Sequence, residues 1–444
     1  MVRRIVLLAC ACILFSAHAL SQKYEIYQKT LKNGLDVIVV QNPAVPLVTV
    51  ELNVKNGGYT ESPEYTGLSH LYEHMFFKAN EAIPNQERYM ERLRELGASW
   101  NGTTSQERVN YFITLGRDSL EPGMQFMFDA ISSPLFKEEE LVKERPVVLG
   151  EYDRNEANPY FLLNRAVEEK VWWKYYSYKS VLGDRKVIIS ATPEKMHTIQ
   201  HRFYVPNNSA LILAGDITPK VGFELAQKYF GGWKRGPDPF KDFTIPEHPP
   251  IPETETVVVE KPVNAVTILM EWQGPSVSKD PKATYAADVF SFILSQQTSK
   301  FYRDLVESGL AYSVSFNYNT LNHVGPISLF AQTSPEKYAE CKKAILDEFS
   351  SMMSDDYFTD AQLENAKTIL AIDEQYGREQ ASQYAHTVGY WWAISGLDYY
   401  LGYVDNVNKV SRNDIRKYLR TYVVDKPYIM GVLVAPSVRS KLGL

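Results

Sequence analysis

The sequence contains little cysteine, which limits the chemistry available to it. Only Cys10, Cys12 and Cys341 occur in 444 residues, and two of them lie at the extreme N-terminus. Removal of that terminus would leave Cys341 alone, and one cysteine cannot form a disulfide within its own chain. We therefore expect neither a disulfide scaffold nor a redox function, and the core must be held by packing.

Long hydrophobic runs are also absent. The longest N-terminal run, residues 5–15, has eleven apolar residues, whereas about 20 are needed to span a bilayer. Arg3 and Arg4 precede this run, and Ala17-His18-Ala19 follows it as a small-x-small sequence. This pattern is typical of a cleaved export signal, so we expect residues 1–19 to be removed and the protein to be periplasmic or secreted, with no membrane span.

An excess of positive charge is missing as well. The formal net charge is −6, and loss of Arg3 and Arg4 with the signal would bring it near −8. No concentrated stripe of lysine and arginine is present. Nucleic acid is therefore not expected as a partner.

Histidine is scarce, but two of the eight histidines form a distinctive pattern. His70, Glu73 and His74 lie within the apolar stretch 65–80, which has the periodicity of a buried helix. Residues at i, i+3 and i+4 project from one face of a helix. Two imidazoles at this spacing can bind one Zn²⁺, and the nearby carboxylate can accept a proton from a water on the metal. The pattern is H-x-x-E-H, the inverzincin motif.

The motif alone leaves an alternative open. A core helix could carry two histidines that are satisfied by backbone carbonyls, although the carboxylate would then also need a buried partner. His197 and His201 have the same spacing, but no acidic residue lies between them, so a structural role is expected there. A zinc site needs a third protein ligand from another element. We predict that Glu151, which lies in a charged, helix-like segment, is this third ligand.

The order of expected elements repeats along the chain. In the first half, Asn33-Gly34 predicts a hairpin turn between two strands, and residues 98–115 alternate like a second hairpin. Similar segments surround Gly97 in the first half and Gly309 in the second. We expect an α+β fold of two homologous domains, each a mainly antiparallel sheet packed with helices. The expected divisions are a signal peptide (1–19), a zinc-binding domain (20–235), a proline-rich linker (236–252) and a second domain without the motif (253–444).

These segments together resemble the pitrilysin/insulinase family of zinc metallopeptidases. The resemblance rests on GLSHLYEHMFF, NGTTSQERVNYF, the distant Glu151 and the second-half GLAYSV. The two-domain length resembles the half-length, processing-peptidase-like branch. The family implies one Zn²⁺ per chain, zinc-dependent hydrolysis of extended oligopeptides, and a chain that forms one half of a clam-shell chamber.

Carried over to this sequence, the resemblance implies His70, His74 and Glu151 as zinc ligands and Glu73 as general base. Glu144 matches a second acidic position of the family, seven residues before Glu151. It could accept a hydrogen bond from a ligand imidazole. However, Pro146 lies between the two glutamates and could kink the helix, which would make Glu144 an ordinary surface acid.

Two further site predictions come only from the resemblance. Asn101 and Gly102 match the dipeptide of the strand to which family members add the substrate as a new β-strand. The family norm is Asn-Ala, and an Asn-Gly pair is also typical of a tight turn.

The second half departs from the family where active members supply an arginine and a tyrosine to the chamber. Tyr312 matches the tyrosine, but Val306 occupies the arginine position. Arg303 is nearby, but it points in a different direction on a helix. The expected partner is therefore a homologous subunit that supplies an Arg/Tyr pair in a heterodimer, with a homodimer as second choice. The alternative function is that of a non-catalytic structural or assembly subunit.

Overall fold

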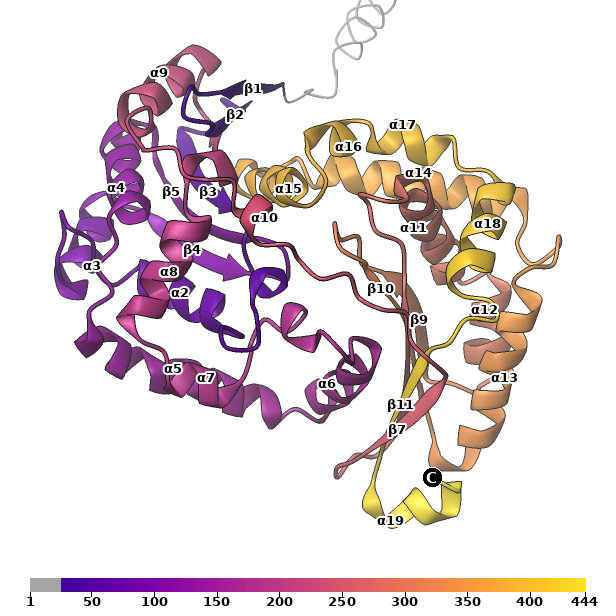
Figure 1. Ribbon diagram of the computed structural model, residues 1–444. Coiled ribbons are helices and arrows are strands. Elements are labelled where there is room, and N and C mark those ends of the chain that lie inside the picture. Colours follow the sequence, from indigo (N-terminus) through magenta and orange to yellow (C-terminus); the bar gives the residue numbers. More distant parts are fainter. Residues whose placement is uncertain (1–24) are drawn as a thin grey trace, which may run out of the picture.

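The computed structural model describes residues 25–444. The chain forms two β-sheets, each packed with helices, with the first half in indigo to magenta and the second in orange to yellow in Figure 1. The expected signal peptide, with Cys10 and Cys12, lies outside the described residues. Cys341 is buried and unpaired. No helix of residues 25–444 combines the length and the apolar character needed to span a bilayer.

The first sheet has six strands in the order β1-β2-β6-β3-β5-β4. Its strands are β1 (Ile26–Thr30), β2 (Asp36–Gln41), β3 (Leu47–Val54), β4 (Ser99–Thr104), β5 (Val109–Gly116) and β6 (Ser209–Gly215). All neighbours are antiparallel except β2 and β6. The β1–β2 connection contains the expected Asn33-Gly34 pair, with Gly34 at φ 94°. Glycine adopts this left-handed conformation without steric cost.

The second sheet repeats this arrangement with one strand fewer. Its strands are β7 (Glu255–Glu260), β8 (Val266–Gln273), β9 (Ser313–Tyr318), β10 (Pro326–Thr333) and β11 (Ile429–Val434). The order is β7-β11-β8-β10-β9, and only β7 and β11 are parallel. It therefore matches β2-β6-β3-β5-β4 strand for strand. The expected fold class, α+β with two mainly antiparallel sheets, is confirmed.

Helices follow the strands in a similar order in the two halves. In the first half they are α2 (Leu68–Phe76), α3 (Gln86–Glu95), α4 (Leu120–Ser132), α5 (Glu138–Glu156), α6 (Pro159–Val171), α7 (Arg185–Ile189), α8 (Pro193–Phe203) and α9 (Pro219–Phe230). The proline-rich segment between the halves contains the short α10 (Pro239–Asp242). In the second half they are α11 (Pro281–Ser295), α12 (Lys300–Tyr302), α13 (Tyr338–Ser351), α14 (Asp360–Tyr376), α15 (Ala381–Ile394), α16 (Leu397–Leu401), α17 (Tyr403–Asn408), α18 (Arg412–Tyr422) and α19 (Pro436–Arg439). The domain boundaries near residues 235 and 253 stay a prediction.

Both faces of the first sheet are covered, which explains the continuous apolar sequence of β2. Val37 and Val39 belong to the main core of the first half, whereas Ile38 and Val40 pack against α15. Successive side chains of a strand point to opposite faces, so a strand that is buried on both faces needs apolar residues at every position. Helix α15, which covers the second face, comes from the second half of the chain (Figure 1).

The exchange of helices is reciprocal. Helix α6 of the first half packs against the second sheet, where Leu163 and Val167 meet Leu433. At both contacts a glycine allows close approach. A Cβ on Gly431 would lie 2.4 Å from Val167 Cγ2, and one on Gly389 of α15 would lie within 2.7 Å of the Asn53 side chain. Each half therefore completes the core of the other.

Candidate metal centre

Helix α2 has one buried face, which anchors it against the first sheet. The side chains of this face are fully buried: Leu68, Leu71, Tyr72, Met75 and Phe76. Phe76 stacks on Tyr111 of β5 with ring centroids 3.7 Å apart, and Tyr72 stacks on Tyr204 at 4.0 Å. Such aromatic contacts add to the free energy gained by burial, and they fix the rotation of the helix about its axis.

A buried carboxylate caps the start of α2. Glu61 accepts hydrogen bonds from the backbone N–H groups of Gly67 at 2.6 Å and Ser69 at 2.5 Å. Helix N-termini have unpaired N–H groups and favour negative charge. Burial nevertheless raises the pKa of Glu61 to about 8, against the lowering effect of these hydrogen bonds.

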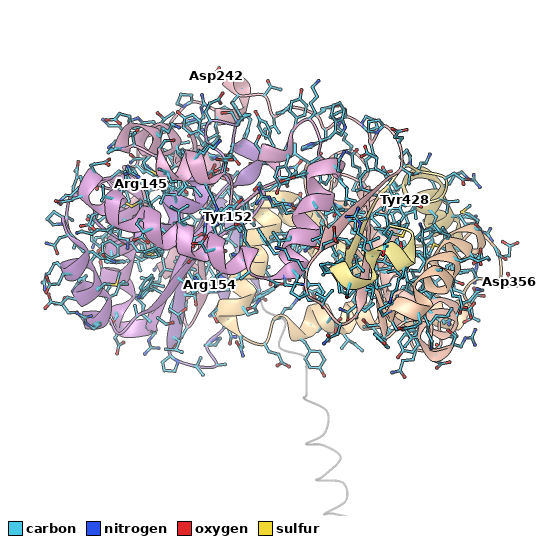
Figure 2. All side chains as sticks on the ribbon, turned by 90° about the horizontal axis from the view of Figure 1, so that it is seen from below. Arg145, Tyr152, Arg154, Asp242, Asp356 and Tyr428 are labelled. Atoms are coloured by element: carbon cyan, nitrogen blue, oxygen red, sulfur yellow. The ribbon has the colours of Figure 1, made fainter. Side chains whose placement is uncertain are left out.

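The opposite face of α2 carries the motif and meets helix α5, whose Tyr152 and Arg154 are labelled in Figure 2. His70 Nε2 lies 3.4 Å from His74 Nε2. Glu151 Oε2 of α5 lies 3.5 Å from His70 Nε2 and 3.6 Å from His74 Nε2. Across residues 25–444, these three side chains are the one group of three or more His, Cys, Asp or Glu whose potential ligand atoms lie within 4.8 Å of one another. The second histidine pair, in α8, does not form such a group.

The three atoms fit a single zinc ion. The centre of a triangle with these sides, 3.4, 3.5 and 3.6 Å, lies about 2.0 Å from each corner, as short as a Zn–N or Zn–O bond. Two imidazoles and one carboxylate are also the ligand set of many catalytic zinc sites, which keep a fourth position open for water. Ordinary packing would not require three polar atoms to converge at this spacing.

Glu144 lies behind the histidines, on the same face of α5 as Glu151. Helix α5 continues through Pro146 without interruption, so residues i and i+7 remain on the same side. Glu144 is only 5 % exposed. Its Oε1 lies 2.9 Å from His74 Nδ1, and its Oε2 lies 2.5 Å from Lys78 Nζ. Glu144 is therefore not a surface acid, and its hydrogen bond leaves His74 Nε2 free to face the other two ligand atoms.

The electrostatic surroundings differ between the two histidines. Burial, together with the neighbouring His74, lowers the pKa of His70 to about 4, which keeps the imidazole neutral near pH 7. Burial also lowers the pKa of His74, but the hydrogen bond to Glu144 and the charges of Glu151, Glu144 and Glu73 outweigh it and raise the pKa. A neutral imidazole is the form that binds a metal.

Glu73 lies on the same face of α2 but outside the group of three ligand atoms. Its Oε2 accepts a hydrogen bond of 2.6 Å from the Thr104 hydroxyl of β4. Burial raises the pKa of Glu73; the Thr104 hydrogen bond and His74 oppose this, and Glu151 adds to it. A carboxylate with a raised pKa accepts a proton from water more readily than an ordinary surface glutamate.

Asn101 and Gly102 lie in the middle of β4 and not in a turn. They pair with Phe112 and Tyr111 of β5. Since β4 is the last strand of the sheet, its other edge is not paired with any strand of the described chain. The turn interpretation of this Asn-Gly pair was therefore wrong, and a position on an edge strand is what strand addition requires.

The second-half residues are not brought to this cluster. Tyr312 lies just before β9 and is 64 % exposed. Val306 and Arg303 belong to the π-helical turn Arg303–Glu307. No hydrogen bond, ion pair or ring contact of the described chain joins Tyr312 to the two histidines or to Glu151.

Sequence reasoning missed three residues of the site, namely Glu61, Lys78 and Thr104. Lys78 lies beyond the end of α2 at Phe76, so helix spacing does not place its side chain. Thr104 alone had a signal in the spacing. Thr104 follows Gly102 by two positions, which places both on one face of the strand. Glu61 had no comparable signal, because its position depends on the loop before α2.

Comparison with protein families supports the resemblance to the pitrilysin/insulinase family. Residues 36–185 match the family described as Insulinase (Peptidase family M16), and residues 190–370 match the Peptidase M16 inactive domain. The two matches follow one another along the chain. His70, Glu73 and His74 lie in the first match, and the second match, to the inactive domain, does not contain the motif.

Several relatives with curated names are called zinc proteases. An uncharacterized zinc protease of Rickettsia felis is 25% identical over 369 residues, covering 82% of this chain and 87% of the relative. The uncharacterized zinc protease YmxG of Bacillus subtilis is 24% identical, covering 77% and 82%. The zinc protease PqqE of Helicobacter pylori is 24% identical, covering 83% and 84%.

Solved structures share the fold across nearly the whole chain. A protease from Helicobacter pylori superposes with a TM-score of 0.81 at 22% identity, covering 93% of this chain and 100% of the other. The periplasmic protease PqqL of Escherichia coli gives a TM-score of 0.78 at 14% identity, and this chain spans 48% of its length. The chain therefore belongs to the pitrilysin/insulinase family (peptidase family M16) and is a member of a zinc protease family.

Proposed function

We propose that this protein is a zinc-dependent endopeptidase that hydrolyses extended oligopeptides. The observation that carries the proposal is the convergence of His70, His74 and Glu151 on one point, with the Glu73 carboxylate on the same helix face. Its cofactor is one Zn²⁺ per chain, held by these three side chains. The names of the relatives support the same reaction class.

Each residue has a separate task in the proposed reaction. Bound Zn²⁺ would lower the pKa of water and polarise the scissile carbonyl. Glu73 takes the proton from the attacking water and passes it to the leaving amine, since its raised pKa suits both transfers. Glu144 accepts a hydrogen bond from His74 Nδ1 and thereby keeps Nε2 directed at the ligand position.

The substrate binds as an added strand on β4. The open edge of β4 offers backbone N–H and C=O groups to an extended chain, and Asn101 and Gly102 lie in its middle. Main-chain pairing gives affinity without requiring a particular peptide sequence. It also requires an extended and accessible segment, so oligopeptides rather than folded proteins are the proposed substrate class.

The proposed active form is a heterodimeric chamber. Val306 occupies the position where active relatives carry an arginine, and Tyr312 has no contact with the zinc ligands within the described chain. A homologous subunit that supplies an Arg/Tyr pair would complete the site. A homodimer is less suitable, because the second copy would also carry Val306.

An assay of the purified protein tests this proposal directly. We expect hydrolysis of a quenched fluorescent oligopeptide to stop with EDTA and to return with Zn²⁺. Addition of the partner subunit should raise kcat by about 10²- to 10³-fold, the effect of one missing donor to the oxyanion. Metal-free protein without hydrolysis, with or without the partner, would favour a structural or assembly subunit. Zinc-dependent hydrolysis that no partner raises would contradict the heterodimer.

The role of Glu144 can be tested separately through zinc affinity. We expect Glu144→Gln to weaken zinc binding by about 10- to 100-fold, because the amide is a poorer acceptor for His74 Nδ1–H than the carboxylate. Competition with a chromophoric chelator measures this change. Glu140→Gln is the matched control, since Glu140 is also buried on α5 but pairs with Lys143. Equal zinc affinity in both variants would contradict the proposed role.

We also propose that the protein acts after export. The N-terminal residues 1–19 have the pattern of a cleaved signal, and the structurally similar PqqL is described as a periplasmic protease. A periplasmic or secreted location follows if residues 1–19 are removed.

A further inference from the structure

Strand β4 presents two residues to the face of α2 that carries Glu73. Successive strand residues point to opposite faces, so Gly102 and Thr104 share one side. A Cβ on Gly102 would lie 3.0 Å from Glu73 Cγ, and the Thr104 hydroxyl donates to Glu73 Oε2 at 2.6 Å. Gly102 has no positive φ that would require glycine; its lack of a side chain leaves space for the glutamate.

Thr104 is the single hydrogen-bond partner of the Glu73 side chain within residues 25–444. A glutamate side chain has three rotatable bonds, and holding them in one arrangement costs conformational entropy. The Thr104 hydroxyl engages Oε2 and leaves Oε1 without a hydrogen bond to the described part of the protein. One carboxylate oxygen is therefore held in place while the other remains available for a proton.

The position of Thr104 is itself well determined. It ends β4, paired with Val109 of β5, and the hairpin tip that follows is fastened to the second half. Glu107 accepts from the backbone N–H groups of Asn322 at 2.7 Å and His323 at 2.8 Å. Glu107 is 2 % exposed, so these bonds are shielded from water. The hydroxyl is therefore presented from a fixed strand end and not from a mobile loop.

We propose that Thr104 is a positioning residue for Glu73, so that the strand that binds the peptide also orients the general base. This inference rests on the proposed peptidase function and deepens it. A peptide that pairs with β4 restrains the same strand that holds Glu73. Binding of an extended substrate and alignment of the base are therefore achieved through one element.

Substitution of Thr104 separates this role from a merely structural one. Thr104→Val keeps the shape but removes the donor, and we expect kcat for the quenched fluorescent oligopeptide to fall by about 10- to 100-fold with KM unchanged. Thr104→Ser retains the hydroxyl and should restore most of kcat. Thr114→Val is the matched control, because that hydroxyl bonds Thr49 in the same sheet, away from the site. Zinc content and thermal stability should be equal in the wild type and in the three variants.

Peptide affinity provides a readout that does not depend on turnover. In a Glu73→Gln background, where the peptide stays intact, addition of Thr104→Val should leave the peptide Kd unchanged. A weakened Kd, an unchanged kcat in Thr104→Val, or a Thr104→Ser enzyme as slow as the valine variant would each overturn the inference while the peptidase function stands. A wild-type protein without zinc-dependent hydrolysis, both alone and with the partner subunit, would overturn both.

Discussion

Replacement of Glu73 by glutamine is expected to leave zinc in place and lower peptide hydrolysis by about 10²- to 10⁴-fold, the usual contribution of a general base. Glutamine has nearly the same shape and can still accept the Thr104 hydrogen bond, but it cannot take a proton from water. Glu73 lies outside the His70–His74–Glu151 group, so the proposed zinc ligands are not altered. Metal content by atomic absorption and kcat by the peptide assay measure the two effects together.

A matched glutamate elsewhere controls for loss of charge. Glu87 is exposed on α3, and Glu87→Gln should keep both zinc and turnover. Two results would contradict the assignment of Glu73. Turnover close to that of the wild type would show that another group accepts the proton, and simultaneous loss of zinc would show that Glu73 acts on metal binding.

Replacement of either His70 or Glu151 by alanine is expected to remove stoichiometric zinc and abolish hydrolysis. Two ligands remain in each variant, and the third corner of the triangle is lost. The loss of zinc affinity should exceed the about 10- to 100-fold expected when an outer hydrogen-bond partner is removed. Metal analysis after dialysis and titration with Zn²⁺ give the two affinities.

The two substitutions come from different helices, which strengthens the test. His70 belongs to α2 and Glu151 to α5, so equal zinc loss in both variants requires one site between them. Glu139→Ala on the exposed face of α5 is the control, and it should retain zinc. If Glu151→Ala also retained stoichiometric zinc, the third ligand would be a different residue.

Much of the site was accessible to sequence reasoning because it is local. His70, Glu73 and His74 are joined by one helical turn, and helix geometry alone places them on one face. Glu151 lies far from His74 along the chain, and no periodicity connects positions so widely separated. The resemblance to a family supplied that residue, and the structure brings its carboxylate to the two imidazoles.

Other features depend on packing that local patterns do not encode. Pro146 left the position of Glu144 open, because a proline can kink a helix; α5 continues through Pro146 and Glu144 reaches His74. The Asn33-Gly34 turn predicted a strand at β2, but no local pattern indicated that α15, near the other end of the chain, covers its second face. The Asn101-Gly102 pair left a turn open as an alternative to the strand, and pairing with β5 keeps it extended.

The exchange of α6 and α15 between the two halves determines where this molecule can open. Swinging the halves apart about the proline-rich segment would withdraw Trp172 and Trp392 from their apolar surroundings. Exposure of apolar area costs about 25 cal/mol per Å², and two such surfaces would be exposed at once. We therefore expect the two halves of the single chain to move together as one rigid unit, without an internal hinge. In the proposed heterodimer, a peptide then reaches the zinc when the two subunits separate, and the strength of their mutual contact sets how often the chamber is accessible.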